Sequence, residues 1–147
     1  MNSNFNLLKH GIIHLDGVDK TGKDSVRREI IKLSNGKILV VVRSYISQIV
    51  YSRIYNRNIN EKYFVNKMKK DNSFFVYLIT DINEIKKRFV KHNEKHLKLN
   101  DIEKHVLIFN NVVEELKNRG ILIVNIDTTN LKSNLTAKKV LNAYNNK

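Results

Sequence analysis

The sequence predicts an α/β domain of three layers, in which a parallel sheet of about four or five strands lies between two layers of helices. Short apolar runs alternate along the chain with longer segments whose apolar residues recur at helical spacing. The runs are apolar throughout rather than at every second position, which is typical of parallel strands buried on both faces. A chain of 147 residues is long enough for one such core. We therefore expect a single domain over residues 1–147.

The first half of the chain is expected to begin with a buried strand. Ile12, Ile13 and Leu15 form an apolar run that stops at Asp16-Gly17, the pattern of a parallel strand that ends in a loop. Apolar spacing and β-branched runs then predict a helix over Lys23–Leu33, a strand over Lys37–Val42, a helix over Ser44–Arg57 with Ser44 as its cap, and a short helix after Asn60.

The second half continues the alternation. The segment SFFVYLI predicts a third strand over Ser73–Ile79, and Thr80-Asp81 opens a basic helix to about His92. A strongly amphipathic helix over Asp101–Asn118 is expected to end at Gly120, a typical C-terminal cap. The last elements predicted are a strand over Ile121–Ile126 and a helix over Ser133–Tyr144.

Composition excludes several classes of protein. The chain contains no cysteine, so neither a disulfide framework nor a thiolate metal site is available to it. No apolar run approaches the roughly 20 residues that cross a membrane. The opening MNSNFNLLKH lacks the charged start and long apolar stretch of a secretion signal. We expect no membrane partner and a cytoplasmic location.

Two interpretations of the net charge of +13 remain open. Clustered lysines and arginines neutralise phosphates, which favours a nucleic-acid partner or a small anionic ligand such as a nucleotide. The chain is also rich in Asn, Lys and Ile and lacks Pro and Trp, as A/T-rich coding produces. In that case many lysines are solvated surface, and the source is a virus, acting in the host cytoplasm, or an organism of low G+C content.

The segment GVDKTGKDS, Gly17 to Ser25, has the pattern of a phosphate-binding loop. It follows a predicted buried strand and opens a predicted helix, as such a loop must. Its glycines, Gly17 and Gly22, permit a tight path on which backbone N–H groups point at a phosphate, and the helix N-terminus adds positive potential. Lys23 reaches the terminal phosphates. The loop, with Lys20 and Thr21 between its glycines, predicts a site for a nucleoside triphosphate.

Asp24 departs from this pattern, which requires a Ser or Thr hydroxyl as a ligand of Mg²⁺. Three alternatives remain open. Asp24 helps to hold the metal, Ser25 supplies the hydroxyl from one position further on, or the site has lost activity.

Residues around the loop resemble the thymidylate kinase family. The pattern G-x-D-x-x-G-K places Asp19 at that family's acidic position. The segment VRSYISQIVY is similar to the family's D-R-x-x-x-S-x-x-x-Y, matching it at Arg43, Ser47 and Tyr51, with Val42 in place of the aspartate.

The resemblance continues to the end of the chain in the same order. FFVYLITDINEIKKRF is similar to the family's strand and entry into the lid helix, and it ends on Arg88. NDIEKH resembles the segment after the lid, and IVNIDTT the last strand. The resemblance implies a three-layer α/β/α P-loop kinase fold, a lid over about residues 86–100, and a homodimer formed through helices.

The activity that this resemblance implies is that of a phosphotransferase of nucleotide biosynthesis. It depends on ATP and Mg²⁺ and moves the ATP γ-phosphoryl group to a deoxynucleoside monophosphate. In the implied arrangement Lys23 and the loop amides hold the ATP phosphates, while Arg43 lies between donor and acceptor. Arg88 and Lys91 close over the triphosphate from the lid.

The resemblance also implies an acceptor side. Asp19 would face the acceptor sugar, and Tyr51 would face the acceptor nucleoside, with Ser47 on the same helix.

Two departures keep other functions open. Val42 removes a carboxylate that family members use near the metal and the acceptor, and Asp24 is a candidate to replace it. A second strand of the family, with its R-E-P motif, is absent. The alternatives are a P-loop kinase that acts on a polynucleotide or a modified base in DNA, and a catalytically weak nucleotide-binding module.

Overall fold

The computed structural model describes residues 11–71, 73–91 and 99–147. These residues form strands and helices in the order β1 (Gly11–Asp16), α2 (Lys23–Leu33), β2 (Ile38–Val42), α3 (Tyr45–Ile54), α4 (Glu61–Lys70), β3 (Phe74–Ile79), α5 (Ile82–Lys91), α6 (Leu99–Asn118), β4 (Ile123–Asp127) and α7 (Ser133–Asn145). Strands and helices alternate as the apolar pattern predicts.

The four strands form one parallel sheet in the order β2-β1-β3-β4. Both β1 and β3 are central, and their residues are buried almost throughout. The fold class predicted from the sequence, three layers around a short parallel sheet, is confirmed.

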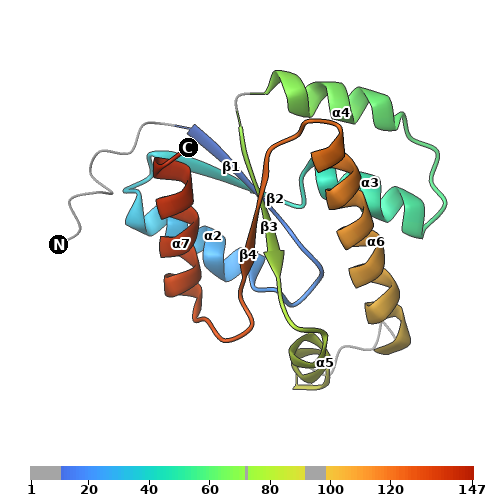
Figure 1. Cartoon of the computed structure of the whole chain (residues 1–147). Helices are drawn as coiled ribbons and strands as arrows, with labels where there is room; N and C mark the ends of the chain where they lie inside the picture. The colour runs from blue at the N-terminus through green and yellow to red at the C-terminus, as the bar shows by residue number, and fades with distance from the viewer. Residues whose placement is uncertain (1–10, 72, 92–98) are drawn as a thin grey trace.

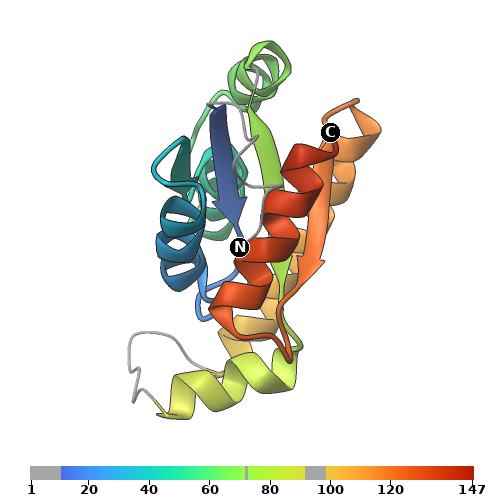
Figure 2. The same ribbon diagram turned by 90° about the vertical axis from the view of Figure 1, so that its left-hand side faces the viewer.

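Helices cover both faces of the sheet (Figure 1). Helices α2 and α7 pack on one face, and α3, α4 and α6 lie on the other (Figure 2). Helix α5 lies instead beyond the end of the sheet toward which β3 points (Figure 1). After β1 the chain continues into α2 on one face, whereas after β3 it passes through α5 and then continues into α6 on the opposite face. Such a reversal opens a crevice at the carboxyl ends of the strands, where ligands of α/β sheets bind.

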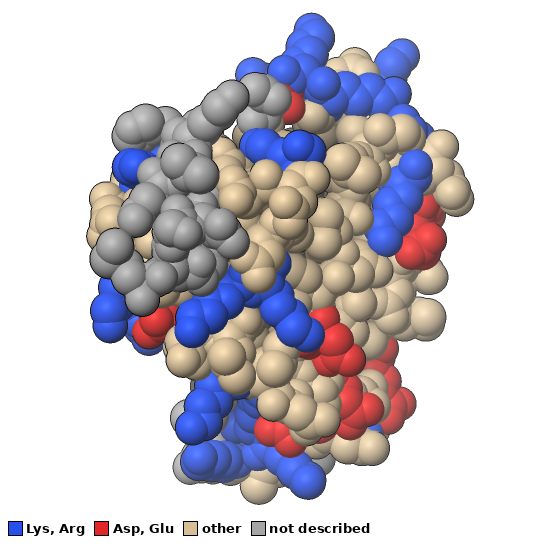
Figure 3. All heavy atoms as spheres, turned by 60° about the vertical axis from the view of Figure 1, so that its left-hand side comes forward, with Lys and Arg blue, Asp and Glu red and all other residues tan. Residues whose placement is uncertain are grey.

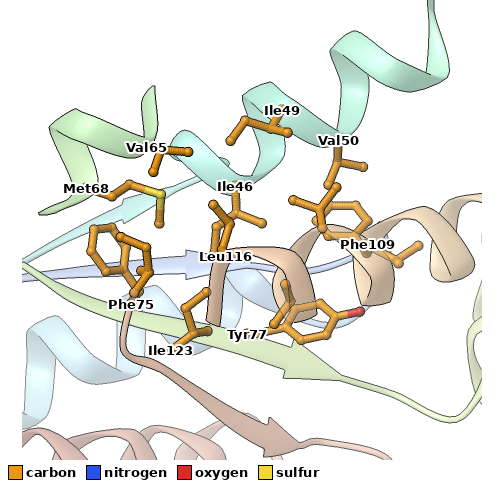
Figure 4. Close-up of a cluster of buried hydrophobic side chains, with 14 of the residues drawn as sticks. Ile46, Ile49, Val50, Val65, Met68, Phe75, Tyr77, Phe109, Leu116 and Ile123 are labelled. Atoms are coloured by element: carbon orange, nitrogen blue, oxygen red, sulfur yellow. The ribbon is translucent and has the colours of Figure 1, made fainter. Parts of the chain in front are cut away.

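Each face of the sheet has its own apolar core. On the face that carries α3 and α6, side chains from both helices meet the aromatic side chains of β3 (Figure 4). Phe109 of α6 is fully buried there and stacks on Tyr77 of β3, with ring centroids 6.0 Å apart. The opposite core is mainly aliphatic, with Ile13, Leu15 and Ile30 beside residues of α7, and it also contains the ring pair of Phe74 and Tyr144. These two cores fix α2 and α3 on either side of β1.

Several element boundaries differ from the expected ones by one to three residues, and two of these shifts concern the helix after Ser44 and the last strand. The helix expected over Ser44–Arg57 ends at Ile54, because Asn56 adopts a left-handed backbone with φ 51° and the N–H of Arg57 closes the end on the carbonyl of Ser52. The last strand begins at Ile123 rather than Ile121. Neither shift moves a predicted site residue to another element.

No helix within the described ranges is long and apolar enough to cross a membrane.

Candidate functional site

The predicted phosphate loop connects β1 to α2, at the carboxyl end of a central strand. Gly17 is required by space: a Cβ there would lie 2.7 Å from the carbonyl oxygen of Leu78 and 3.0 Å from Oγ1 of Thr21. Gly22 is required by conformation, because it takes φ 89° at the N-cap of α2, and Lys20 is also left-handed at φ 68°. The backbone therefore follows a path that ordinary residues adopt rarely.

Lys23, the first residue of α2, binds with its side chain to the backbone of the loop that precedes it. Its side chain is buried, and Nζ donates to the carbonyl oxygens of Gly17 at 2.7 Å and Val18 at 3.0 Å. Burial lowers the pKa of Lys23 to about 8, an effect that the negative charge of Asp19 partly opposes. To contact a phosphate, the ammonium group must leave these two carbonyls. A bound anion would then stabilise the charged form of Lys23.

A cleft of about 340 Å³ lies beside the loop. It is lined by Asp19, Lys20, Gly22, Lys23, Asp24, Ser25, Arg43 and Phe89. The fold thus brings Arg43, from the end of β2, to the same cleft as the loop.

Lysines and arginines also lie outside this cleft. On the face shown in Figure 3 they form several separate groups, divided by uncharged surface. This distribution fits the interpretation that much of the net charge is solvated surface.

Helix α5 is anchored on the phosphate loop by Arg88. Its guanidinium donates to the carbonyl of Lys20 at 2.6 Å, and its Nε donates to Glu84 at 3.2 Å. The Lys20 ammonium in turn lies over the ring of Phe89, 5.8 Å from its centroid. Lys91 is exposed at the end of α5 and does not line the cleft. Of the lid expected over residues 86–100, residues 92–98 lie outside the described residues.

Hydroxyl groups at the carboxyl ends of β3 and β4 connect the loop to the sheet. Oγ1 of Thr128 donates to the carbonyl of Thr21 at 3.4 Å, and it lies 2.5 Å from Oγ1 of Thr80. Thr21 in turn donates from Oγ1 to the carbonyl of Val18 at 2.8 Å. Thr80 directly follows β3 and Thr128 directly follows β4. Neither threonine was predicted from the sequence as part of the site, although each directly follows a strand and the carboxyl ends of parallel strands meet at one edge of the sheet.

On the other side of the cleft, Arg43 has a left-handed backbone with φ 57°. Its N–H donates to the carbonyl of Leu15 at 3.2 Å, and its guanidinium lies 3.9 Å from Oδ1 of Asp19. A non-glycine residue in this region is strained and is held there by its surroundings. Two of the residues expected on the acceptor side, Arg43 and Asp19, are therefore neighbours.

Tyr51 lies on α3 against α6. Its ring makes edge contacts with Phe109, at 5.8 Å between centroids, and with His105, at 6.0 Å. Burial, then the charge of Asp19, raises the pKa of Tyr51, and burial lowers that of His105. His105 was not predicted, although it interrupts the apolar face that Ile102 and Phe109 define on α6.

Ser47 is also on α3, but it is buried and does not line the cleft. Its hydroxyl donates to Oδ1 of Asp16 at 2.6 Å. Asp16 was expected only as the residue that ends the first strand.

The two candidate metal ligands, Asp24 and Ser25, both line the cleft. Asp24 is exposed, and Ser25 is partly buried and accepts from Arg28 at 3.3 Å. Among residues 11–71, 73–91 and 99–147, no three acidic, histidine or cysteine side chains gather into a metal-binding group. A carboxylate and a hydroxyl fit Mg²⁺, which binds through hard oxygen ligands, keeps several waters and relies on substrate phosphates for the remainder.

The chain is similar in structure to the YorR protein of Bacillus subtilis, whose crystal structure is a complex with phosphorylated GDP. The TM-score is 0.72, the sequences are 20% identical, and the match covers 90% of this chain and 95% of that chain. Neither a protein-family model nor a curated protein matches the sequence. The likeness shows a shared three-layer α/β fold, which is consistent with the P-loop kinase fold expected from the sequence.

Proposed function

We propose that this protein is a nucleotide kinase that transfers the γ-phosphoryl group of ATP to a deoxynucleoside monophosphate of the thymidylate kind. One observation carries the proposal. Lys23 of the phosphate loop and Arg43 at the end of β2 line a single cleft, and Arg88 contacts the loop at its edge. Cations from three elements therefore converge where two phosphorylated ligands can meet.

On the donor side, the loop amides and the N-terminus of α2 bind the ATP phosphates. Lys23 leaves the carbonyls of Gly17 and Val18 and pairs with the triphosphate. Arg88 holds α5 against the loop through the carbonyl of Lys20, which limits water around the transferred group. Phosphoryl transfer needs positioning and charge stabilisation rather than a covalent enzyme intermediate, and these residues supply both.

On the acceptor side, Arg43 binds the acceptor phosphate or the transferred group, because its planar donor fork matches phosphate oxygens. The ion pair with Asp19 directs the guanidinium across the cleft. Asp19 then contacts the acceptor sugar, and Tyr51 borders the acceptor nucleoside. Asp24 and Ser25 are the residues that would hold Mg²⁺, which supplies further neutralisation of phosphate charge when bound.

The similarity to YorR supports nucleotides as the ligand class, because that protein binds phosphorylated GDP. The similarity also affects which base should be tested. Because YorR binds a guanine nucleotide, guanosine phosphates should be tested beside thymidine phosphates.

A second candidate function is phosphorylation of a polynucleotide. Tyr55 stacks on Tyr51 at 6.2 Å, is largely exposed, and carries the Arg57 guanidinium 5.2 Å from its ring centroid. A row of aromatic rings thus extends from the buried Phe109 of α6 through Tyr51 of α3 to Tyr55 at the surface, and aromatic rows with arginines bind single strands by stacking.

The deciding experiment is a coupled ADP-release assay with ATP, Mg²⁺ and a panel of acceptors. The panel holds the monophosphates of thymidine, deoxyuridine, modified pyrimidines and deoxyguanosine, and a single-stranded oligonucleotide. Turnover with one monophosphate, lost in Lys23→Met, supports the proposal and names the substrate. Turnover with the oligonucleotide alone, together with a steep salt dependence of its binding, supports the second candidate. ATP binding without turnover on any acceptor contradicts both and indicates a nucleotide-binding module.

A further inference from the structure

Helix α4 has a dense group of lysines on its exposed side. The exposed residues of this helix are Lys62, Tyr63, Asn66, Lys67, Lys69 and Lys70. With about 100° between successive residues, these six occupy one continuous arc of about 160° around the helix axis. The rest of the circle faces the protein and includes the buried Val65 and Met68. The six exposed residues, called the α4 surface below, include four cations and no acid.

The acidic residues beside the α4 surface are engaged by other groups. Glu61, at the start of the helix, accepts two hydrogen bonds from the guanidinium of Arg53, at 2.9 and 3.1 Å. Asp71, directly after the helix, accepts from the hydroxyl of Tyr45 at 2.8 Å. Within residues 11–71, 73–91 and 99–147, no acidic side chain forms a salt bridge with a lysine of the α4 surface. The charge of these four lysines is therefore directed at solvent, where it attracts anions.

Tyr63 places an aromatic ring among these lysines. The residue is 53% exposed, yet its ring makes an edge contact with Phe64 at 5.6 Å between centroids. The Lys67 ammonium lies 5.9 Å from the centroid of the same ring, and the side chain of Asn60 caps the helix by accepting from the backbone N–H of Tyr63 at 3.1 Å. Proteins bind single-stranded nucleic acid with this combination, because aromatic rings stack on bases while cations contact the phosphates.

The α4 surface is separate from the cleft beside the phosphate loop. Helix α4 leads into the amino end of β3, whereas the phosphate loop follows the carboxyl end of β1, and these two strands are parallel. Figures 1 and 2 accordingly show α4 at one end of the molecule and α5 at the other. Figure 3 is turned about the same vertical axis and shows a group of lysines and arginines at the top, where α4 lies. No residue of α4 lines the cleft.

The chemistry of the α4 surface selects among anionic partners. A helix that binds a lipid surface needs apolar side chains on the side that enters the membrane. In α4 the apolar Val65 and Met68 are buried in the protein, and Tyr63 is the one aromatic residue of the exposed arc. An acidic protein would pair with the lysines but would have no base to stack on the ring. A single strand uses both the lysines and the ring.

We propose that the α4 surface binds single-stranded nucleic acid, with its lysines on the phosphates and Tyr63 stacked on a base. This inference goes beyond the proposed function, because the strand is bound away from the cleft and is not the acceptor of the phosphoryl group. It also differs from the second candidate function, which places a strand on Tyr55 and leads it to Arg43.

The test is the fluorescence anisotropy of a labelled single-stranded oligonucleotide, titrated with the full chain at several salt concentrations. One variant combines Lys69→Gln with Lys70→Gln, and a second is Tyr63→Ala. The matched control combines Lys138→Gln with Lys139→Gln, which removes two adjacent exposed lysines from α7 on the opposite face of the sheet. Thermal unfolding verifies the fold of each variant, and the Lys23→Met protein tests whether the cleft takes part.

We expect the double α4 variant to bind the oligonucleotide about tenfold more weakly and to lower the slope of log affinity against log salt by about 1.4, since each lost phosphate contact removes about 0.7. Tyr63→Ala should also bind about tenfold more weakly, but with an unchanged slope, because stacking releases no counterions. The α7 control should stay within about twofold of the unmodified protein. Lys23→Met should bind the oligonucleotide normally.

Three results would overturn the inference. Equal losses in the α4 and α7 double variants would mean that net charge alone attracts the strand. Loss of binding in Lys23→Met would place the strand in the cleft and favour the second candidate function. Displacement by polyglutamate as effective as by unlabelled oligonucleotide, or no binding of the oligonucleotide at all, would exclude a site for nucleic acid. None of these results alters turnover with a monophosphate in the ADP-release assay, so the proposed function is tested separately.

Discussion

The proposed donor and acceptor sides of the site are built in different ways. The proposed donor side is a loop of consecutive residues whose backbone N–H groups would contact phosphate, and it is held by Thr128 after β4 and by Arg88 of α5. The proposed acceptor side consists of side chains from separate elements, Arg43 after β2 and Tyr51 on α3, and Tyr51 packs against His105 of α6. A backbone site is specified by a short motif, whereas a site of separate side chains depends on how helices pack.

This difference has a functional consequence. In the proposed function the loop binds phosphate, which every nucleoside triphosphate carries, so the donor side can be rigid and general. The acceptor side would have to select a base and a sugar, and the aromatic contacts of Tyr51 lie between two helices that pack through side chains. Substitutions on one side should therefore change KM for ATP, and substitutions on the other should change KM for the acceptor.

The largest effect is expected for Lys23→Met, which removes the donor-side ammonium and keeps an apolar stem of similar length. Phosphoryl transfer should fall by about 10²–10³-fold or more, because one preorganised charge facing the transferred group is lost. The ADP-release assay measures it, and circular dichroism controls for the fold. Activity within a few fold of the unmodified protein would mean that the loop does not bind the triphosphate.

The next largest effects should distinguish the two sides. Arg88→Met is expected to raise KM for ATP about tenfold, because α5 loses its bond to the Lys20 carbonyl, while KM for the acceptor stays unchanged. Arg43→Met should instead raise KM for the acceptor by about tenfold or more. Initial-rate kinetics with each substrate varied in turn measure both. The separation fails if the two variants raise the same KM.

The parts predictable from the sequence are those specified by local patterns. Apolar runs predicted every strand, and the spacing of Gly17, Gly22 and Lys23 predicted the loop that the structure forms between β1 and α2. Such a motif needs only its own strand and helix to take shape.

The parts that could not be predicted depend on contacts between distant residues. Ser44 was expected to cap α3, and it does occupy the N-cap position, but its hydroxyl pairs with Nδ1 of His14. The cap is Asp16, a residue 28 positions away from Ser44. No local pattern indicates that β1 and α3 meet in this way. No local pattern indicates the contact between Tyr51 and His105 either.

The pH dependence offers a smaller effect with a defined sign. Since the pKa of Lys23 is lowered from its ordinary value of 10.5 to about 8, the lysine loses its proton above pH 8 in the folded protein. The value of kcat/KM for ATP should then fall up to about tenfold per pH unit above that point.

The free energy of unfolding should change in the opposite direction. The part of it that comes from Lys23 rises between pH 8 and 10.5, because the unfolded chain binds more protons there than the folded one. Comparison with Lys23→Met in urea unfolding at pH 8 and pH 10 measures this second trend, and equal differences at both pH values would contradict it.

The smallest effect concerns the bracing of the loop. Thr128→Val keeps the shape of the side chain but removes the hydroxyl between Thr80 and the carbonyl of Thr21, so the buried Thr80 hydroxyl loses its partner. We expect a loss of about 1–3 kcal/mol in the free energy of unfolding and a KM for ATP that rises a few fold, with the acceptor KM unchanged. Thr128→Ser restores the hydroxyl and is the matched control in both urea unfolding and kinetics. Equal losses in the serine and valine variants would show that the methyl group, not the hydroxyl, supports the loop, and the donor side would then be braced by packing as the acceptor side is.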